Sequence, residues 1–171
     1  MQQRLWQQRG LTRLEFAIVA ILLAMLLGTY LRAVRYYQEQ AEAISVRLTL
    51  SHIQVGFAQE WMERISKSTN RQGMTELAGA NPVRWLEYPP PNYLGEMKTP
   101  KMERLDRGSW FFDLQRKELV YLPRLAGHLE LSGSEDTKVL RWTIRLAQNP
   151  KAKDPEFGDL ALVPVYPYQW F

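Results

Sequence analysis

A long uncharged stretch lies near the N-terminus. From Phe16 to Leu31 the chain carries no charged residue and is almost entirely apolar. Taken as an α-helix rising 1.5 Å per residue, residues 11–31 span roughly 31 Å, about the thickness of a bilayer's hydrocarbon core. A helix also satisfies its own backbone polar groups, as lipid requires. The pattern therefore predicts one transmembrane helix over residues 11–35.

The charges on either side of this stretch suggest its orientation. Residues 1–10 form a short basic leader without acids, and Arg4, Arg9 and Arg13 favour a cytoplasmic N-terminus. Arg32 and Arg35 on the other side reduce the asymmetry. A cleaved secretory signal needs small residues two apart after the apolar run, and the segment after Leu27 has no clean pair. We therefore expect a retained, single-pass anchor with the rest of the chain exported.

Beyond the anchor, a helical rhythm continues and predicts an amphipathic helix over residues 36–70. One apolar row of period 3.5 is interrupted only by Ser51: Tyr30, Val34, Tyr37, Ala41, Ile44, Leu48, Ser51, Val55, Ala58, Met62 and Ile65. A second row lies on roughly the opposite side: Val46, Leu50, Ile53, Phe57 and Trp61. Two interpretations stay open. One row packs on the protein's own sheet while the other meets neighbouring helices, or the same domain covers both rows. Polar residues and then Gly73 should end the helix near Ser66–Asn70.

The next segment, residues 74–107, is expected to be an ordered loop with aromatic anchors. Five prolines exclude long regular elements there: Pro82, Pro89, Pro90, Pro91 and Pro100. The triple proline is interpreted as a rigid turn of this loop rather than as a ligand for a proline-binding groove.

From residue 108 to 166 the pattern predicts a sheet. Trp110–Leu114 and Leu119–Leu122 flank a polar turn at Gln115–Lys117 and form a hairpin. His128–Leu131 is a short third strand. In Val139–Leu146, Leu140, Trp142, Ile144 and Leu146 should face inward, and Arg141, Thr143 and Arg145 outward. Pro164 confines a last element, Leu160–Tyr166, to an edge.

The predicted fold class is α+β, with a long N-terminal helix packed on a small antiparallel sheet of about four strands. Residues 71–171 form the exported domain, and the aromatic tail Tyr166–Phe171 should fold back over the sheet rather than form an exposed docking patch.

Composition narrows the possible functions. The 171 residues hold 22 Lys and Arg against 18 Asp and Glu, and these charges are interspersed. No basic stripe suggests nucleic-acid binding. The absence of cysteine excludes disulfides, thiolate nucleophiles and Cys-based zinc sites. His52 and His128 lack the spacing of a metal or catalytic site, and no Gly-rich phosphate loop occurs. We expect no enzyme activity, cofactor or metal. The acidic segment 153–159 does not match an EF-hand, so a solvated turn is favoured over a calcium loop.

Glu15 is the unusual residue of the anchor. An ionised carboxylate inside a membrane helix costs a few kcal/mol. Glu15 either lies near the interface at little cost or has a cationic partner. Arg13 is two residues away and points to another face. A free amine made by cutting after Gly10, or a neighbouring chain, could supply that cation.

The segment Arg9-Gly10-Leu11-Thr12-Arg13-Leu14-Glu15-Phe16, followed by the apolar run, resembles the class III signal of type IV pilins and type II secretion pseudopilins. The resemblance implies that a prepilin peptidase cuts after Gly10. Leu11 would then be the first mature residue, with a methylated amine. Glu15 would be the acid that contacts the amine of an adjacent subunit during assembly. Arg13, where an apolar residue is usual, implies a subunit present in few copies or at a tip.

The hairpin Trp110–Tyr121 is similar to one in minor pilins and pseudopilins, and residues 81–95 with it loosely resemble proteins of mannose-sensitive haemagglutinin pilus clusters. The expected function is that of a minor pilin or pseudopilin in the bacterial inner membrane, with its C-terminal domain in the periplasm. The implied partners are prepilin peptidase, other pilin-like subunits, the inner-membrane assembly platform and membrane lipid. The alternative is a membrane-tethered periplasmic binding or scaffold module with an uncleaved anchor.

Overall fold

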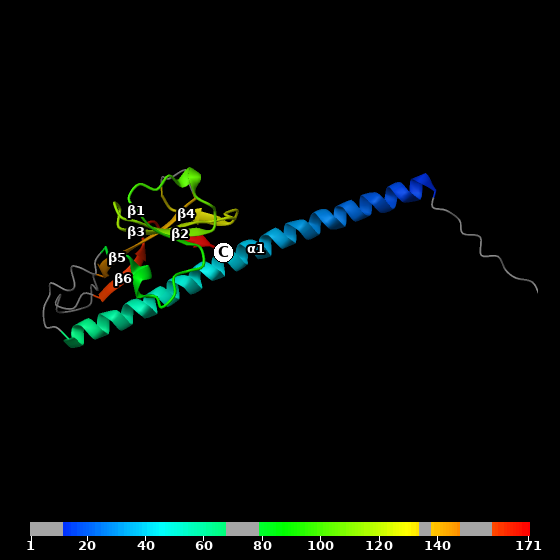
Figure 1. Cartoon of the computed structure of the whole chain (residues 1–171). Helices are drawn as coiled ribbons and strands as arrows, with labels where there is room; N and C mark the ends of the chain where they lie inside the picture. The colour runs from blue at the N-terminus through cyan, green and yellow to red at the C-terminus, as the bar shows by residue number, and fades with distance from the viewer. Residues whose placement is uncertain (1–11, 68–78, 134–137, 148–158) are drawn as a thin grey trace, which may run out of the picture. The chain divides into compact units, whose positions relative to one another are not determined.

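A computed structural model describes residues 12–67, 79–133, 138–147 and 159–171. They comprise one long helix, α1 (Arg13–Lys67), and seven short strands (Figure 1). Helix α1 has 55 residues and ends within the region predicted from its stop signals. The chain divides into two compact units, residues 1–38 and 39–171, which are described in turn.

In the first unit, the large apolar side chains of α1 are exposed. Among the described residues, α1 is the one helix long and apolar enough to cross a membrane, and its apolar segment is not buried by the protein. This agrees with the predicted single membrane-spanning segment.

The second unit has two sheets. The larger one has the order β1 (Tyr93–Met97), β2 (Ser109–Asp113), β3 (Glu118–Leu122), β5 (Leu140–Ala147) and β6 (Asp159–Pro164). The smaller one pairs β4 (Leu129–Leu131) with β7 (Tyr168–Trp170). Two short 3-10 helices, η1 (Pro82–Trp85) and η2 (Met102–Arg104), precede the hairpin β2–β3. The α+β class, the hairpin with its turn at residues 114–117, and β6 as an edge strand are confirmed.

Three details differ from the predicted sheet. Strand β1 lies inside the region expected to be a loop and pairs parallel to β2, so the sheet is mixed rather than antiparallel. It is only five residues long, follows the triple proline and contains Gly95 at φ +93°, so its strand signal is weak. Strand β4 pairs with β7 instead of joining the main sheet, and β7 extends the β-structure beyond residue 166.

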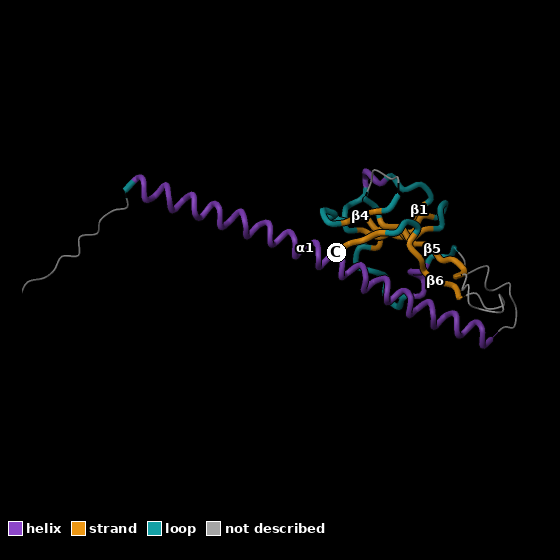
Figure 2. The backbone as a smooth tube through the Cα atoms, turned by 180° about the vertical axis from the view of Figure 1, so that it is seen from behind, coloured by secondary structure: helices purple, strands orange, loops and turns teal. Residues whose placement is uncertain are grey.

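One face of the main sheet packs on residues 43–57 of α1 (Figure 2). The helix contributes Ala43, Val46, Ile53 and Phe57. The sheet contributes mainly large side chains: Trp110, Phe112, Leu119, Tyr121, Leu140 and Trp142. The ring centroids of Trp110 and Tyr121 are 4.6 Å apart, and those of Trp110 and Trp142 are 5.5 Å apart. Leu140, Trp142 and Ile144 therefore face the core, as predicted; the side chain of Leu146 is not among those described.

The opposite sheet face carries a second cluster. Phe111, Val120, Leu122 and Val139 are buried beneath the segment that holds Met97, Met102 and Leu105. Arg141 was expected to be solvent-facing because it alternates with the core residues, but this segment covers it. Its guanidinium is buried and lies 3.1 Å from Oε2 of Glu118. Arg145, further along β5, is exposed as predicted.

The two apolar rows of the helix have different environments. Val46, Ile53 and Phe57 of the second row are buried against the sheet, and Leu50 is half-buried. In the first row all members from residue 41 to 62 are exposed; we call them the open row: Ala41, Ile44, Leu48, Ser51, Val55, Ala58 and Met62. Ile44, Leu48, Val55 and Met62 are 54%, 56%, 57% and 69% exposed. The interpretation that the same domain covers both rows is therefore wrong.

Candidate functional site

The N-terminus of α1 carries the predicted assembly residue. Glu15 lies in the first turn, and its carboxylate accepts a hydrogen bond from the backbone N–H of Thr12 at 2.8 Å. The backbone N–H of Glu15 donates in return to Oγ1 of Thr12 at 3.3 Å. These reciprocal bonds form a capping box, which satisfies two N–H groups at the helix start. Glu15 thus has a local partner that the sequence interpretation missed, although the spacing Thr12-x-x-Glu15 is its usual signature.

The other predicted processing residues, Gly10 and Leu11, lie outside the described residues, so cleavage stays a prediction. The acidic segment 153–158 also lies outside them, and the side chain of Asp159 is not described. The solvated turn without bound calcium that we expect there likewise stays a prediction. Among the described residues, no three His, Asp or Glu side chains gather where they could hold a metal ion.

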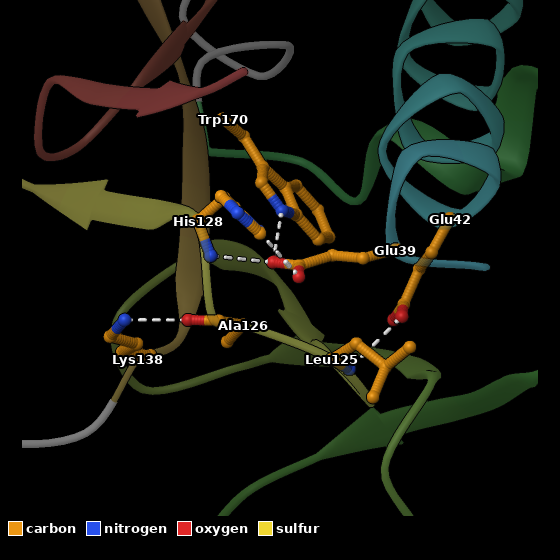
Figure 3. Close-up of polar contacts among 7 residues, drawn as sticks. All are labelled: Glu39, Glu42, Leu125, Ala126, His128, Lys138 and Trp170. Atoms are coloured by element: carbon orange, nitrogen blue, oxygen red, sulfur yellow. Dashed lines mark hydrogen bonds and ion pairs between the residues drawn. The ribbon is translucent and has the colours of Figure 1, made fainter. Parts of the chain in front are cut away.

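A buried acid on α1 anchors the domain to the helix. Glu39 is 5% exposed, and its carboxylate accepts three hydrogen bonds (Figure 3). The backbone N–H of His128 donates at 2.8 Å, and the indole N–H of Trp170 at 3.2 Å. Nδ1 of His128 lies 3.0 Å from Oε2 of the acid. One carboxylate therefore joins the helix to the start of β4 and to the end of β7.

Burial by itself would raise the pKa of Glu39. The hydrogen bonds from the side chain and backbone of His128 and from Trp170, together with the charge of His128, outweigh burial and lower the pKa of this carboxyl below its ordinary value of 4.5. Glu39 is therefore held as a carboxylate at neutral pH. Its acceptor positions are used by protein donors, which indicates a structural role rather than a reactive one.

A second acid one turn further on, Glu42, makes a parallel set of contacts. Its carboxylate accepts from the hydroxyl of Tyr121 at 2.8 Å and from the backbone N–H groups of Arg124 and Leu125 at 2.7 and 3.1 Å. Figure 3 shows Glu39 and Glu42 pointing from α1 toward the segment that leads into β4. Together the two acids satisfy backbone donors in a connection that has no strand partner.

The aromatic tail folds back over the core of the domain, as predicted, and it also joins this network. Trp170 is 2% exposed, and its backbone carbonyl accepts a hydrogen bond from Nη2 of Arg47 on α1 at 2.7 Å. The ring of Phe171 stacks on that of His128 with centroids 4.9 Å apart. Sequence reasoning missed this cluster. The sequence did contain a signal for it. Glu39 and Glu42 precede Val46 at helical spacing, so they lie on the same side of the helix as the apolar row that packs on the sheet.

Comparisons with models of known protein families, with curated proteins and with solved structures found no match.

Proposed function

We propose that this protein is a minor pilin or pseudopilin. In this role a prepilin peptidase cuts the chain after Gly10, α1 anchors it in the inner membrane, and the domain lies in the periplasm. The subunit then enters or primes a filament of the type IV pilus or type II secretion class. The proposed role is non-enzymatic, and its partners are other pilin-like subunits and the assembly platform.

The open row carries this proposal. A helix that serves only to support its own domain needs one packing surface, and the docked face of α1 supplies it through Val46, Ile53 and Phe57. The open row leaves a second apolar surface in water, which is unfavourable unless another molecule covers it. Its period of 3.5 residues is the period of helices that pack along one another. A subunit that packs its helix among others has a use for such a surface, whereas a simple tether has none.

The N-terminal motif supplies the second support. Gly10, Leu11, Thr12 and Glu15 stand at the spacing of the pilin-type signal. Cutting after Gly10 would leave Thr12 in the chain, so the capping box would survive processing. The new amine of Leu11 would then be the immediate chain neighbour of the Thr12 N–H that already donates to Glu15. The same carboxylate can cap its own helix and present its remaining lone pairs to an amine of the same or a neighbouring chain.

The mass of the N-terminal peptide tests the proposal. Full-length protein should be extracted from membranes of cells with an active prepilin peptidase and from matched cells lacking it. We expect a start at Leu11 with a methylated amine in the first sample and a start at Met1 in the second. A Gly10→Leu variant, inserted to the same level, should keep residues 1–10 in both. An intact leader in the presence of active peptidase would refute the proposal and leave the membrane-tethered binding or scaffold module as the better account.

A further inference from the structure

The residues of the open row occupy the two core positions of a heptad repeat. Leu48, Val55 and Met62 occupy one core position of the heptad, called a, and Ile44, Ser51 and Ala58 occupy the other, called d. All six are exposed. The row that packs on the sheet through Val46, Ile53 and Phe57, which we call the docked row, lies on the opposite side of the helix. A partner could therefore cover the open row without displacing the sheet.

The side chains that border the open row carry almost no charge. Gln40, Arg47 and Gln54 lie on one border, and Ser45, His52 and Gln59 on the other. In a parallel pair of identical helices, the border residues that meet across the interface are five positions apart. Gln40 then meets Ser45, Arg47 meets His52, and Gln54 meets Gln59. No acid faces an acid, and the guanidinium of Arg47 is already directed to the carbonyl of Trp170 in its own chain. The border is therefore compatible with a second copy of itself.

From these features we propose that, before any filament forms, two copies of this chain pair through the open row as a parallel, in-register helix dimer. This inference rests on one part of the proposed function, the membrane anchoring of α1, because anchors inserted from the same side make the two helices parallel. It does not require processing or filament assembly.

The membrane also fixes the register. A shift by one heptad would displace one helix by about 10.5 Å along the other, about a third of the hydrocarbon core. Two identical anchors in one bilayer resist such a displacement because one apolar segment would leave the lipid. Ser51 favours the same register. In register, two Ser51 hydroxyls face each other and can share a hydrogen bond, whereas a one-heptad shift places each against Ile44 or Ala58. A polar residue at a core position is a known determinant of register in paired helices.

The absence of cysteine allows a direct test by disulfide cross-linking. Full-length Leu48→Cys and Val55→Cys variants should be oxidised in inner-membrane vesicles from a host without pilus or type II secretion genes. Glu130→Cys, at an exposed position of β4, is the matched control. We expect disulfide dimers to predominate for Leu48→Cys and Val55→Cys and to stay at the background level for Glu130→Cys. Adding Leu48→Glu to the Val55→Cys chain should return its dimer to background. Because Leu48 is exposed, that change should leave the unfolding midpoint of the domain unaltered.

Co-expression of Leu48→Cys and Val55→Cys chains with tags of different size tests the register. Same-position dimers should exceed the mixed dimer in yield. Equal yields for Leu48→Cys, Val55→Cys and Glu130→Cys would overturn the inference. A predominant Leu48–Val55 dimer would overturn it in favour of staggered packing. Cross-links that form only when other pilin-like subunits are co-expressed would show that one of those subunits, and not a second copy of this chain, covers the open row, and would overturn the inference.

The N-terminal mass of the same samples, with prepilin peptidase co-expressed, separates the two proposals. Same-position dimers with an intact leader would refute the pilin-type function and support the dimer. A cleaved, methylated chain with no dimer above the control would support the pilin-type function and refute the dimer.

Discussion

Replacing Glu39 by alanine should destabilise the domain more than any exposed Glu→Ala change. The change removes the acceptor of the Trp170 indole N–H and of the His128 backbone N–H. Leaving one buried donor unsatisfied costs about 1–3 kcal/mol. Trp170 is buried and incurs this cost in full, whereas the side chain of His128 is 53% exposed and water can replace part of its lost contacts. We therefore expect Glu39→Ala to lower the free energy of unfolding by about 2–4 kcal/mol.

Two variants calibrate this value. Glu39→Gln keeps the shape and one acceptor oxygen, so it should cost about 1–2 kcal/mol. Glu130→Ala removes an exposed carboxylate from β4 and should change stability by less than about 0.5 kcal/mol. Urea unfolding of the full-length protein in detergent micelles, followed by tryptophan fluorescence, measures all three. The apolar part of α1 should stay in the micelle, so the transition reports the domain. A Glu39→Ala protein as stable as Glu130→Ala would refute the reasoning.

The lowered pKa of Glu39 sets the sign of a pH effect. A carboxyl whose folded pKa is below its unfolded pKa adds stability that is present above the unfolded value. It loses that contribution as the pH falls through the folded value. The wild-type domain should therefore lose stability below about pH 4.5 through Glu39, and Glu39→Gln should lose less over the same interval. Parallel pH profiles of the two proteins would contradict the assignment.

Two other changes test separate parts of the molecule. Glu15→Ala should leave cleavage after Gly10 largely intact and impair filament or secretion output, measured as surface pili or secreted protein in a deletion strain; unchanged output would make Glu15 a helix cap only. Gly56→Ala should destabilise the domain although alanine favours helix by about 1 kcal/mol, because its Cβ would lie 2.6 Å from the backbone oxygen of Trp85. We expect a net loss of about 1 kcal/mol in the same urea assay, since overpacking costs about 1–3 kcal/mol, and a gain would contradict it.

Local patterning was sufficient to predict the long helix and the hairpin. The 3.5-residue rhythm predicted α1, and the alternation about the turn at residues 115–117 predicted the hairpin, because both depend on neighbours within a few residues. The same patterning could not reveal the partner of each strand. His128–Leu131 looked like a further strand of one sheet, yet β4 pairs with β7, which lies about 40 residues later. Strand β1 was hidden by flanking prolines and by Gly95.

The acids of α1 illustrate the same limit. Glu39 looked like an ordinary polar residue of an amphipathic helix. Its environment depends on Trp170, which lies 131 positions away and which no local rule places beside it. Arg141 was misjudged for the same reason, since a short-range alternation cannot predict that Met102 and Leu105 cover the outer face of the sheet. Glu15 is the opposite case, because its capping partner is three residues away and its spacing was visible from the start.

The span between Glu39 and Trp170 has a consequence for biosynthesis. Ribosomes synthesise a chain from its N-terminus at about 5–20 residues per second. Roughly 7–26 s therefore pass between the synthesis of Glu39 and that of Trp170, whose indole completes the hydrogen bonds of the Glu39 carboxylate. In the first part of that interval, before the strands of the main sheet have been made, the docked row is as exposed as the open row. A nascent chain held at the membrane then presents two apolar surfaces instead of one. A chaperone that shields α1 would be needed most in those seconds. Truncations that remove β7 should leave Glu39 permanently without the indole of Trp170 and make the protein a substrate for quality-control proteases.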